Sequence, residues 1–234
     1  MQREASFTGI FGELASLLND AWREIALYVL VIGGLAAIGI LVGLTEPATA
    51  MFDFGFELNS NKGPASALFG LVALIVSVVA NYLLLKRFLA VRGRAQEQRN
   101  RFWPYFGMGI LSGFAIVFGL ILLVVPGIIL LVRWSAASGY VIGAGQGVMD
   151  SLGLSWEATK GHGWAIFFAG LVLFVGIIVA GAVLGGISGA ISMEAVETVS
   201  AFVEAAYGAI FAGFGIAIYC RVQDDTEQLS EVFA

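Results

Sequence analysis

Six apolar runs, each long enough to cross a lipid bilayer, constrain this sequence more than any other feature. A bilayer core of about 30 Å needs about 20 apolar residues in a helix. Six segments reach that length: 25–44, 65–85, 105–125, 127–145, 164–187 and 199–220. Of the 234 residues only 12% are charged, which is about half the fraction usual in soluble domains. We therefore expect an all-α, polytopic integral membrane bundle of about six transmembrane helices.

The basic residues predict the orientation of these helices. With six spans, one side of the membrane receives Arg3, Arg23, Lys86, Arg87, Arg92, Arg94, Arg99, Arg101, Lys160 and Arg221, whereas the other receives only Lys62. Because positive residues stay on the cytoplasmic side, both termini are expected there. Trp22, Trp103, Trp164 and Tyr219 fall at the same boundary, where amphipathic rings prefer to lie.

The segments outside the spans are short. Residues 1–24 carry an apolar stripe at helical spacing, made of Phe7, Ile10, Phe11, Leu14, Leu17, Leu18 and Trp22. Glu13 and Asp20 fall off that stripe, so the segment is predicted to be an amphipathic helix lying on the inner leaflet. Residues 221–234 are acidic and polar, and we expect a mobile cytoplasmic tail.

The third and fourth spans are separated only by Pro126 and Gly127, both of which interrupt helices. The combined apolar run is too long for one span. A tight hairpin at the membrane face is the simplest arrangement, and a kinked or re-entrant one is the alternative.

Glycines spaced by four residues predict where helices pack closely. Gly39 and Gly43 in the first span match the depth of Gly181, Gly185 and Gly189 in the fifth. Gly109 and Gly113 in the third span match Gly139 and Gly143 in the fourth, which Gly147 follows. Only glycines at equal depth in the membrane can lie opposite each other. We therefore expect the first span to pack against the fifth and the third against the fourth. A flexible gate or an oligomer contact is the alternative use of these glycines.

Arg133 is the most informative single residue, because it is a charge placed within a span. It lies six positions past Gly127, about 9 Å along a helix, and a charge at such depth usually faces protein or a water-filled cavity. Glu204 lies at similar depth in the sixth span, so the two are predicted to pair. A structural ion pair is favoured over a ligand-binding role.

The loop between the second and third spans collects six basic residues and one acid, Glu97. Lys86, Arg87, Arg92, Arg94, Arg99 and Arg101 are candidates for contact with anionic lipid or an acidic partner. The simpler alternative is that they only set topology. His162 is interpreted as a polar boundary residue rather than a ligand, and Cys220 as a small buried filler rather than a lipid acceptor.

One stretch resembles a known bacterial family. The residues that carry the resemblance are Val125-Pro126-Gly127-Ile128, Arg133, Ser155-Trp156, Thr159-Lys160-Gly161 and Trp164. They are similar to the membrane domain found beside some glycerophosphodiester phosphodiesterases and to its stand-alone six-helix relatives of unknown function. The resemblance covers about residues 124–168 and implies a bacterial cytoplasmic (inner) membrane. It implies no phosphodiesterase activity, since in the fused relatives that reaction belongs to a separate soluble barrel.

No catalytic motif, cofactor motif or metal-ligand cluster is found in the sequence, so no cofactor is expected. The leading hypothesis is a non-enzymatic membrane module that scaffolds, anchors or regulates a partner. Its expected partners are membrane lipids and either another protein or a second copy, and no nucleic acid. A transporter or permeation pathway that uses Arg133 is the main alternative, and a membrane enzyme ranks third.

Overall fold

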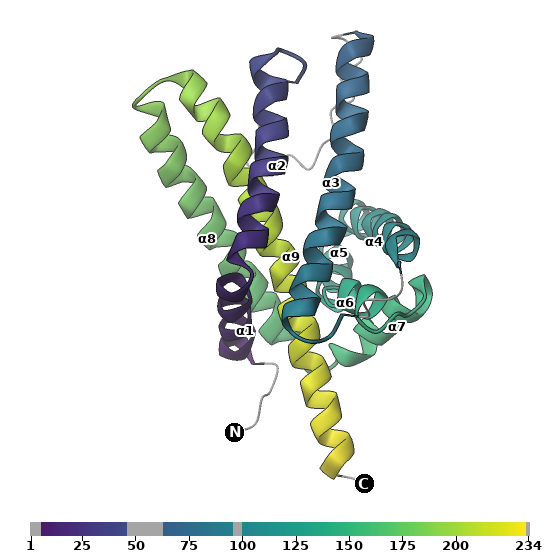
Figure 1. The fold of residues 1–234 in the computed structure, drawn as a ribbon. Helices are drawn as coiled ribbons and strands as arrows, with labels where there is room; N and C mark the ends of the chain where they lie inside the picture. The colour runs from purple at the N-terminus through teal and green to yellow at the C-terminus, as the bar shows by residue number, and fades with distance from the viewer. Residues whose placement is uncertain (1–5, 46–62, 96–99, 233–234) are drawn as a thin grey trace. The chain divides into compact units, whose positions relative to one another are not determined.

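The computed structural model describes residues 6–45, 63–95 and 100–232, without the side chains of residues 193–194 and 225–232. Helices joined by turns and short loops make up these ranges (Figure 1). In chain order they are α1 (Phe7–Asp20), α2 (Trp22–Leu41), α3 (Pro64–Val91), α4 (Phe102–Leu122), α5 (Val124–Arg133), α6 (Ala137–Ile142), α7 (Val148–Ala158), α8 (Gly163–Gly189) and α9 (Met193–Val232). The predicted all-α class is confirmed.

Six helical segments of the described chain are long and apolar enough to cross a membrane. They are Trp22–Leu41, Pro64–Val91, Phe102–Leu122, Val124–Ile142, Gly163–Gly189 and Ala195–Asp224. Large apolar side chains on these segments are exposed, among them Leu27 at 64% and Ile121 at 76%. Such exposure is costly in water and suits hydrocarbon. The chain is a multi-pass helical membrane protein.

The chain divides into two compact units. The first contains the described residues of Met1–Ala21, Leu85–Leu171 and Phe211–Ala234. The second contains those of Trp22–Leu84 and Val172–Ile210. Helices α3, α8 and α9 therefore contribute one part to each unit.

In the first unit, α4, α5, α6 and α7 pack against one another (Figure 1). The amphipathic helix α1 covers the second half of α9, where a Cβ atom at Gly213 would lie 3.3 Å from Leu14 and 3.5 Å from Phe88. Ile10 and Leu17 of α1 are fully buried. The inner part of the predicted stripe thus packs on protein, while Phe7 and Trp22 remain exposed.

In the second unit, α2 packs closely on the first half of α9. A Cβ atom at Gly33 would lie 2.9 Å from the Cα atom of Phe202, so only glycine permits this approach. Farther along α2, Gly39 faces the ring of Phe69 on α3. The hydroxyl of Tyr207 on α9 donates a hydrogen bond of 3.0 Å to the carbonyl of Ile177 on α8.

The turn between α4 and α5 lies at Leu123, which is extended with φ −155° and ψ 128°, rather than at Pro126 and Gly127. Pro126 sits in the first turn of α5, where backbone N–H groups lack helical partners and proline is tolerated. Gly127 allows α4 and α5 to approach each other closely, because a Cβ atom there would lie 2.6 Å from the backbone nitrogen of Leu120. The two helices pack as an antiparallel pair, as the hairpin interpretation predicts.

The third and fourth spans contact each other as predicted, but their closest points are at other glycines than the predicted ones; the contact of the first span with the fifth stays a prediction. Positions Gly109, Gly113 and Gly185 have open space where a Cβ atom would be. The close approach of the third and fourth spans is at Gly119 and Gly127 instead. Gly139 meets Tyr219 of α9, and Gly43 has a positive φ of 72° after the end of α2. Spacing identifies small residues, but it does not identify the side chains opposite them.

Helix α9 extends beyond the predicted sixth span, 199–220, at both ends. One helix runs from Met193 to Val232, so the predicted tail from Arg221 continues the span as a helix as far as Val232. The mobility of this tail stays a prediction. Polar sequence within a helix is no obstacle to its continuation when strong helix formers such as Glu and Gln are present.

Candidate functional site

A cluster of charged residues joins three segments that are far apart in the sequence. Arg92, just past α3, donates from Nε to Glu13 Oε1 at 2.6 Å and from Nη1 to Asp20 Oδ2 at 2.8 Å. Its Nη2 donates to Ser16 Oγ at 2.9 Å. Glu13 also pairs with Arg221 of α9 at 3.4 Å. We call Glu13, Ser16, Asp20, Arg92 and Arg221 the Glu13 clamp.

Geometry on α1 explains why one guanidinium reaches three side chains. Positions 13, 16 and 20 recur at helical spacing and so share one face. The planar fork of arginine presents five donors and is suited to several acceptors at once. The Glu13 and Arg92 side chains are only 18% and 17% exposed, so their attraction is screened less than that of a surface pair.

A second arginine extends the contact to the distal part of α9. Arg94 donates to Gln223 Oε1 at 2.9 Å and forms an ion pair with Asp224. Its guanidinium also lies 6.0 Å from the ring centre of Tyr219. Tyr219 packs edge-on against Tyr140 of α6 at 4.9 Å. The same end of the first unit therefore joins α1, the end of α3, α6 and α9.

Two pKa shifts follow from the clamp. The hydrogen bond from Arg92 lowers the pKa of the Asp20 carboxyl below its ordinary 3.8. Burial alone would lower the pKa of Arg92, but its hydrogen bond to Asp20 and its attraction to Glu13 outweigh burial and raise that pKa. Both shifts favour the charged forms that make the contacts.

The basic residues of this loop therefore differ in what they contact. Arg92 and Arg94 bind side chains of their own chain, while Arg87 is exposed. Lys86 and Arg101 also have interaction partners, and Arg99 lies outside the described residues. Contact of the loop with anionic lipid or an acidic partner stays a prediction.

Arg133 is the last residue of α5 and is held by α7. Its carbonyl oxygen accepts hydrogen bonds from Ser155 Oγ at 2.7 Å and from Thr159 Oγ1 at 3.3 Å. The last carbonyls of a helix have no partner within the helix, so these hydroxyls complete the end of α5. Ser155 and Thr159 are both fully buried, and they fix α7 at this helix end.

The Arg133 guanidinium lies 5.6 Å from the ring centre of Trp156. Its Nη1 is buried and has no hydrogen-bond partner among the described residues. Buried charged nitrogens are costly when they lack an acceptor. A cation–π contact with Trp156 offsets part of that cost.

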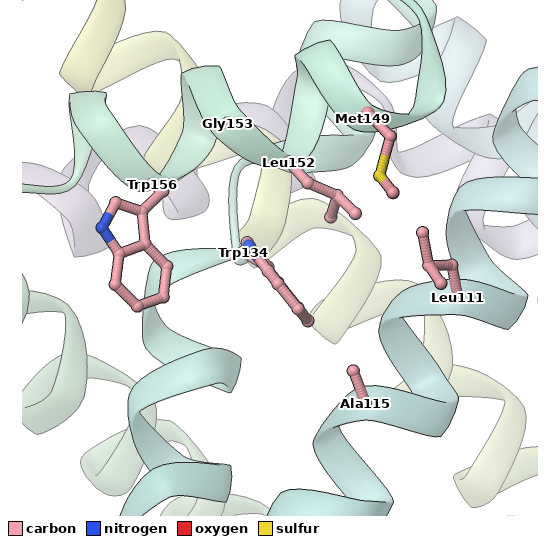
Figure 2. A pocket seen from close by; sticks show the side chains of 7 residues that line it. All are labelled: Leu111, Ala115, Trp134, Met149, Leu152, Gly153 and Trp156. Carbon is pink, nitrogen blue, oxygen red and sulfur yellow. The ribbon is translucent and has the colours of Figure 1, made fainter.

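Trp156 also lines an open apolar groove of about 350 Å³ between α4, α7 and the turn after α5 (Figure 2). Its walls are Leu111, Ala115, Trp134, Met149, Leu152, Gly153 and Trp156. Figure 2 shows Trp134 between Trp156 and the two α4 residues, with the Met149 and Leu152 side chains above it. We call this hollow the Trp134–Trp156 groove.

The remaining candidate residues are placed as follows. Glu204 is on α9 in the second unit and Arg133 is in the first, so their pairing stays a prediction; Glu204 has an interaction of its own. Cys220 is buried at 4% exposure, as a small filler would be. His162 is partly buried just before α8 and has a partner. Within the described ranges no group of three or more His, Cys, Asp or Glu residues could hold a metal ion.

Comparison with known proteins adds no assignment. No family model, no curated protein and no solved structure matches the chain.

Sequence reasoning missed the acidic half of the clamp and the groove. The spacing of Glu13, Ser16 and Asp20 was a usable signal, because it places three polar groups on one helix face. For the groove no comparable signal exists, since Trp134 and Trp156 lie on separate elements that meet only in the folded chain.

Proposed function

We propose that this protein is a non-enzymatic scaffold, anchor or accessory subunit for a partner protein or lipid process. We place it in a bacterial cytoplasmic membrane, with both termini in the cytoplasm. The residue pattern across 124–168 supports an affiliation with the membrane domain that accompanies glycerophosphodiester phosphodiesterases.

The observation that carries this proposal is that Glu13 is bound by both Arg92 and Arg221. One carboxylate thereby holds the N-terminal helix against the loop after α3 and against the end of the apolar part of α9. Charged side chains at this end of the first unit hold segments of the chain together. They form a rigid surface to which a partner could bind, and we call this surface the platform. The same contact brings an N-terminal and a C-terminal segment together, which supports an even number of spans.

A transport role for Arg133 is the second candidate, and it is favoured by the buried Nη1, which has no hydrogen-bond partner within the described part of the chain. An arginine at such a position is suited to receive an anion.

Gentle-detergent purification of the full chain tests the proposal. The protein, its Glu13→Gln variant and the matched Glu157→Gln variant are compared for stoichiometric protein partners by mass spectrometry. Glu157 is an apt control because its contact is an exposed i,i+3 pair with Lys160. A partner kept by the protein and by Glu157→Gln, but lost from Glu13→Gln, supports the platform.

The second arm measures solute flux into liposomes containing the protein or Arg133→Leu. Absence of any stoichiometric partner, together with anion flux that Arg133→Leu abolishes, would overturn the platform in favour of transport.

A further inference from the structure

We propose that the Trp134–Trp156 groove binds one acyl chain of an anionic phospholipid from the surrounding bilayer, and that Arg133 holds the phosphate. This site is independent of the platform function proposed above. It is also distinct from the basic loop, because Arg133 lies at the end of α5.

The chemistry of the walls argues for an acyl chain. All seven lining residues are apolar or glycine apart from the polar edges of the two indoles. Leu111 of α4 and Met149 of α7 are 38% and 70% exposed, so the groove opens to the surroundings of the helices. Its volume of about 350 Å³ is near the lower end for small-molecule sites. In a membrane protein an open apolar groove meets lipid tails first.

The charge beside the groove argues for an anionic head group. The Arg133 guanidinium faces Trp156, which is itself a wall of the groove. Its Nη1 has no acceptor in the described part of the chain. A phosphate supplies the oxygen acceptors that guanidinium groups bind with two parallel hydrogen bonds. An amphiphile carrying a phosphate next to an acyl chain therefore matches both features at once.

The surrounding contacts fix the backbone from which the Arg133 side chain extends. Because Ser155 and Thr159 bind the Arg133 carbonyl, α7 places Trp156 and the end of α5 in a fixed relation. A preorganised cation binds its anion with less loss of side-chain freedom.

Tryptophan quenching by brominated lipid tests the site. Trp22, Trp103 and Trp164 are 60%, 75% and 74% exposed, so replacing them with phenylalanine leaves Trp134 and Trp156 as the reporters at small cost. This background is reconstituted in phosphatidylcholine with a small fraction of either dibromo-phosphatidylglycerol or dibromo-phosphatidylcholine. We expect phosphatidylglycerol to quench at about tenfold lower fraction, which corresponds to about 1.4 kcal/mol.

Two variants separate the head group from the tail. In the Arg133→Gln variant, the two brominated lipids should quench tryptophan fluorescence at the same lipid fraction. Gly153→Leu should weaken quenching by phosphatidylglycerol while leaving Arg133 in place, because a Cβ atom at Gly153 meets only open space. Gly109→Leu is the matched control, since Gly109 also has open space and does not line the groove. This variant should keep the preference for phosphatidylglycerol over phosphatidylcholine.

Four outcomes would overturn the proposal. Equal quenching by the two lipids in the unmodified groove denies head-group recognition. A preference that survives Arg133→Gln denies the role of the arginine. Protection from both lipids shows that a second protein copy covers the groove. Displacement of the brominated lipid by inorganic phosphate alone would assign the site to a free anion instead, which also contradicts it.

Discussion

Arg92 Nε lies 2.6 Å from Glu13 Oε1, although the two residues are separated by 79 positions in the sequence. From the sequence, the basic loop after α3 predicts only the orientation of the spans. The bond from Arg92 to Glu13 shows that this loop is also a fixed part of the fold. The exposed ion pair of Lys160 and Glu157 offers the contrast, because it joins the last turn of α7 only to the turn that directly follows it.

Glu13→Gln should release α1 from the rest of the first unit. The change removes the charge that both Arg92 and Arg221 approach and leaves two partly buried guanidinium groups underpartnered. We expect a loss of about 1–3 kcal/mol, read as faster hydrogen exchange across residues 7–20 in detergent. Glu157→Gln should cost less than about 1 kcal/mol. Equal protection of α1 in both variants would count against the clamp.

Acid should loosen α1 through Asp20. Because the folded-state pKa of Asp20 lies below 3.8, its stabilising contact is complete above pH 3.8 and is lost as the pH falls through the folded-state value. The protein and its Asp20→Asn variant should therefore differ in α1 protection at neutral pH and converge in acid. Hydrogen exchange of α1 against pH measures this. A difference that persists unchanged at pH 2 would assign it to something other than titration.

Gly127→Ala should destabilise the α4–α5 hairpin. A methyl group at Gly127 would lie 2.6 Å from the backbone nitrogen of Leu120, which cannot rotate away as a side chain can. We expect a loss of about 1–3 kcal/mol, measured as a lower Tm in detergent. Gly113→Ala on α4 meets open space and should leave the Tm unchanged or slightly raised. A Gly127→Ala protein as stable as Gly113→Ala would show that the hairpin is looser than described.

Ser155→Ala should weaken the attachment of α7 to the end of α5. It removes the 2.7 Å hydrogen bond to the Arg133 carbonyl, at a cost of about 1 kcal/mol. Thr159→Val keeps the branched shape and removes the 3.3 Å contact with the Arg133 carbonyl, together with the 2.8 Å hydrogen bond to the carbonyl of Ser155. The double variant should cost more than the sum of the single ones, because only then does the Arg133 carbonyl lose both side-chain hydroxyls. Additive changes in Tm would show that the two hydroxyls act separately.

Placing the two termini tests the orientation. A Cys220→Ala background removes the single cysteine, and Ser6→Cys supplies an exposed label near the start of α1. Labelling of Ser6→Cys in sealed inverted vesicles, and protease access to a C-terminal tag, should both report the cytoplasmic face. Labels on opposite faces would contradict an even number of spans.

The spans could be predicted because hydropathy is a local property of the sequence, and all six segments overlap the predicted ones. Helix ends were less predictable, since Pro126 is tolerated in the first turn of α5 and the turn falls at Leu123. The clamp and the groove could not be predicted from one sequence. Both depend on which distant side chains meet, as Gly139 shows by facing Tyr219 rather than the glycines of α4.

The double attachment of Glu13 sets an order of events during synthesis. Arg92 emerges while only two of the six candidate spans have been made, whereas Arg221 emerges near the end of the last one. The carboxylate can therefore acquire its first arginine early and its second only when the final helix is in place. In a nascent chain that has made Arg92 but not yet Arg221, α1 would be bound by one arginine only. Full attachment of α1 therefore requires that the last helix has been made.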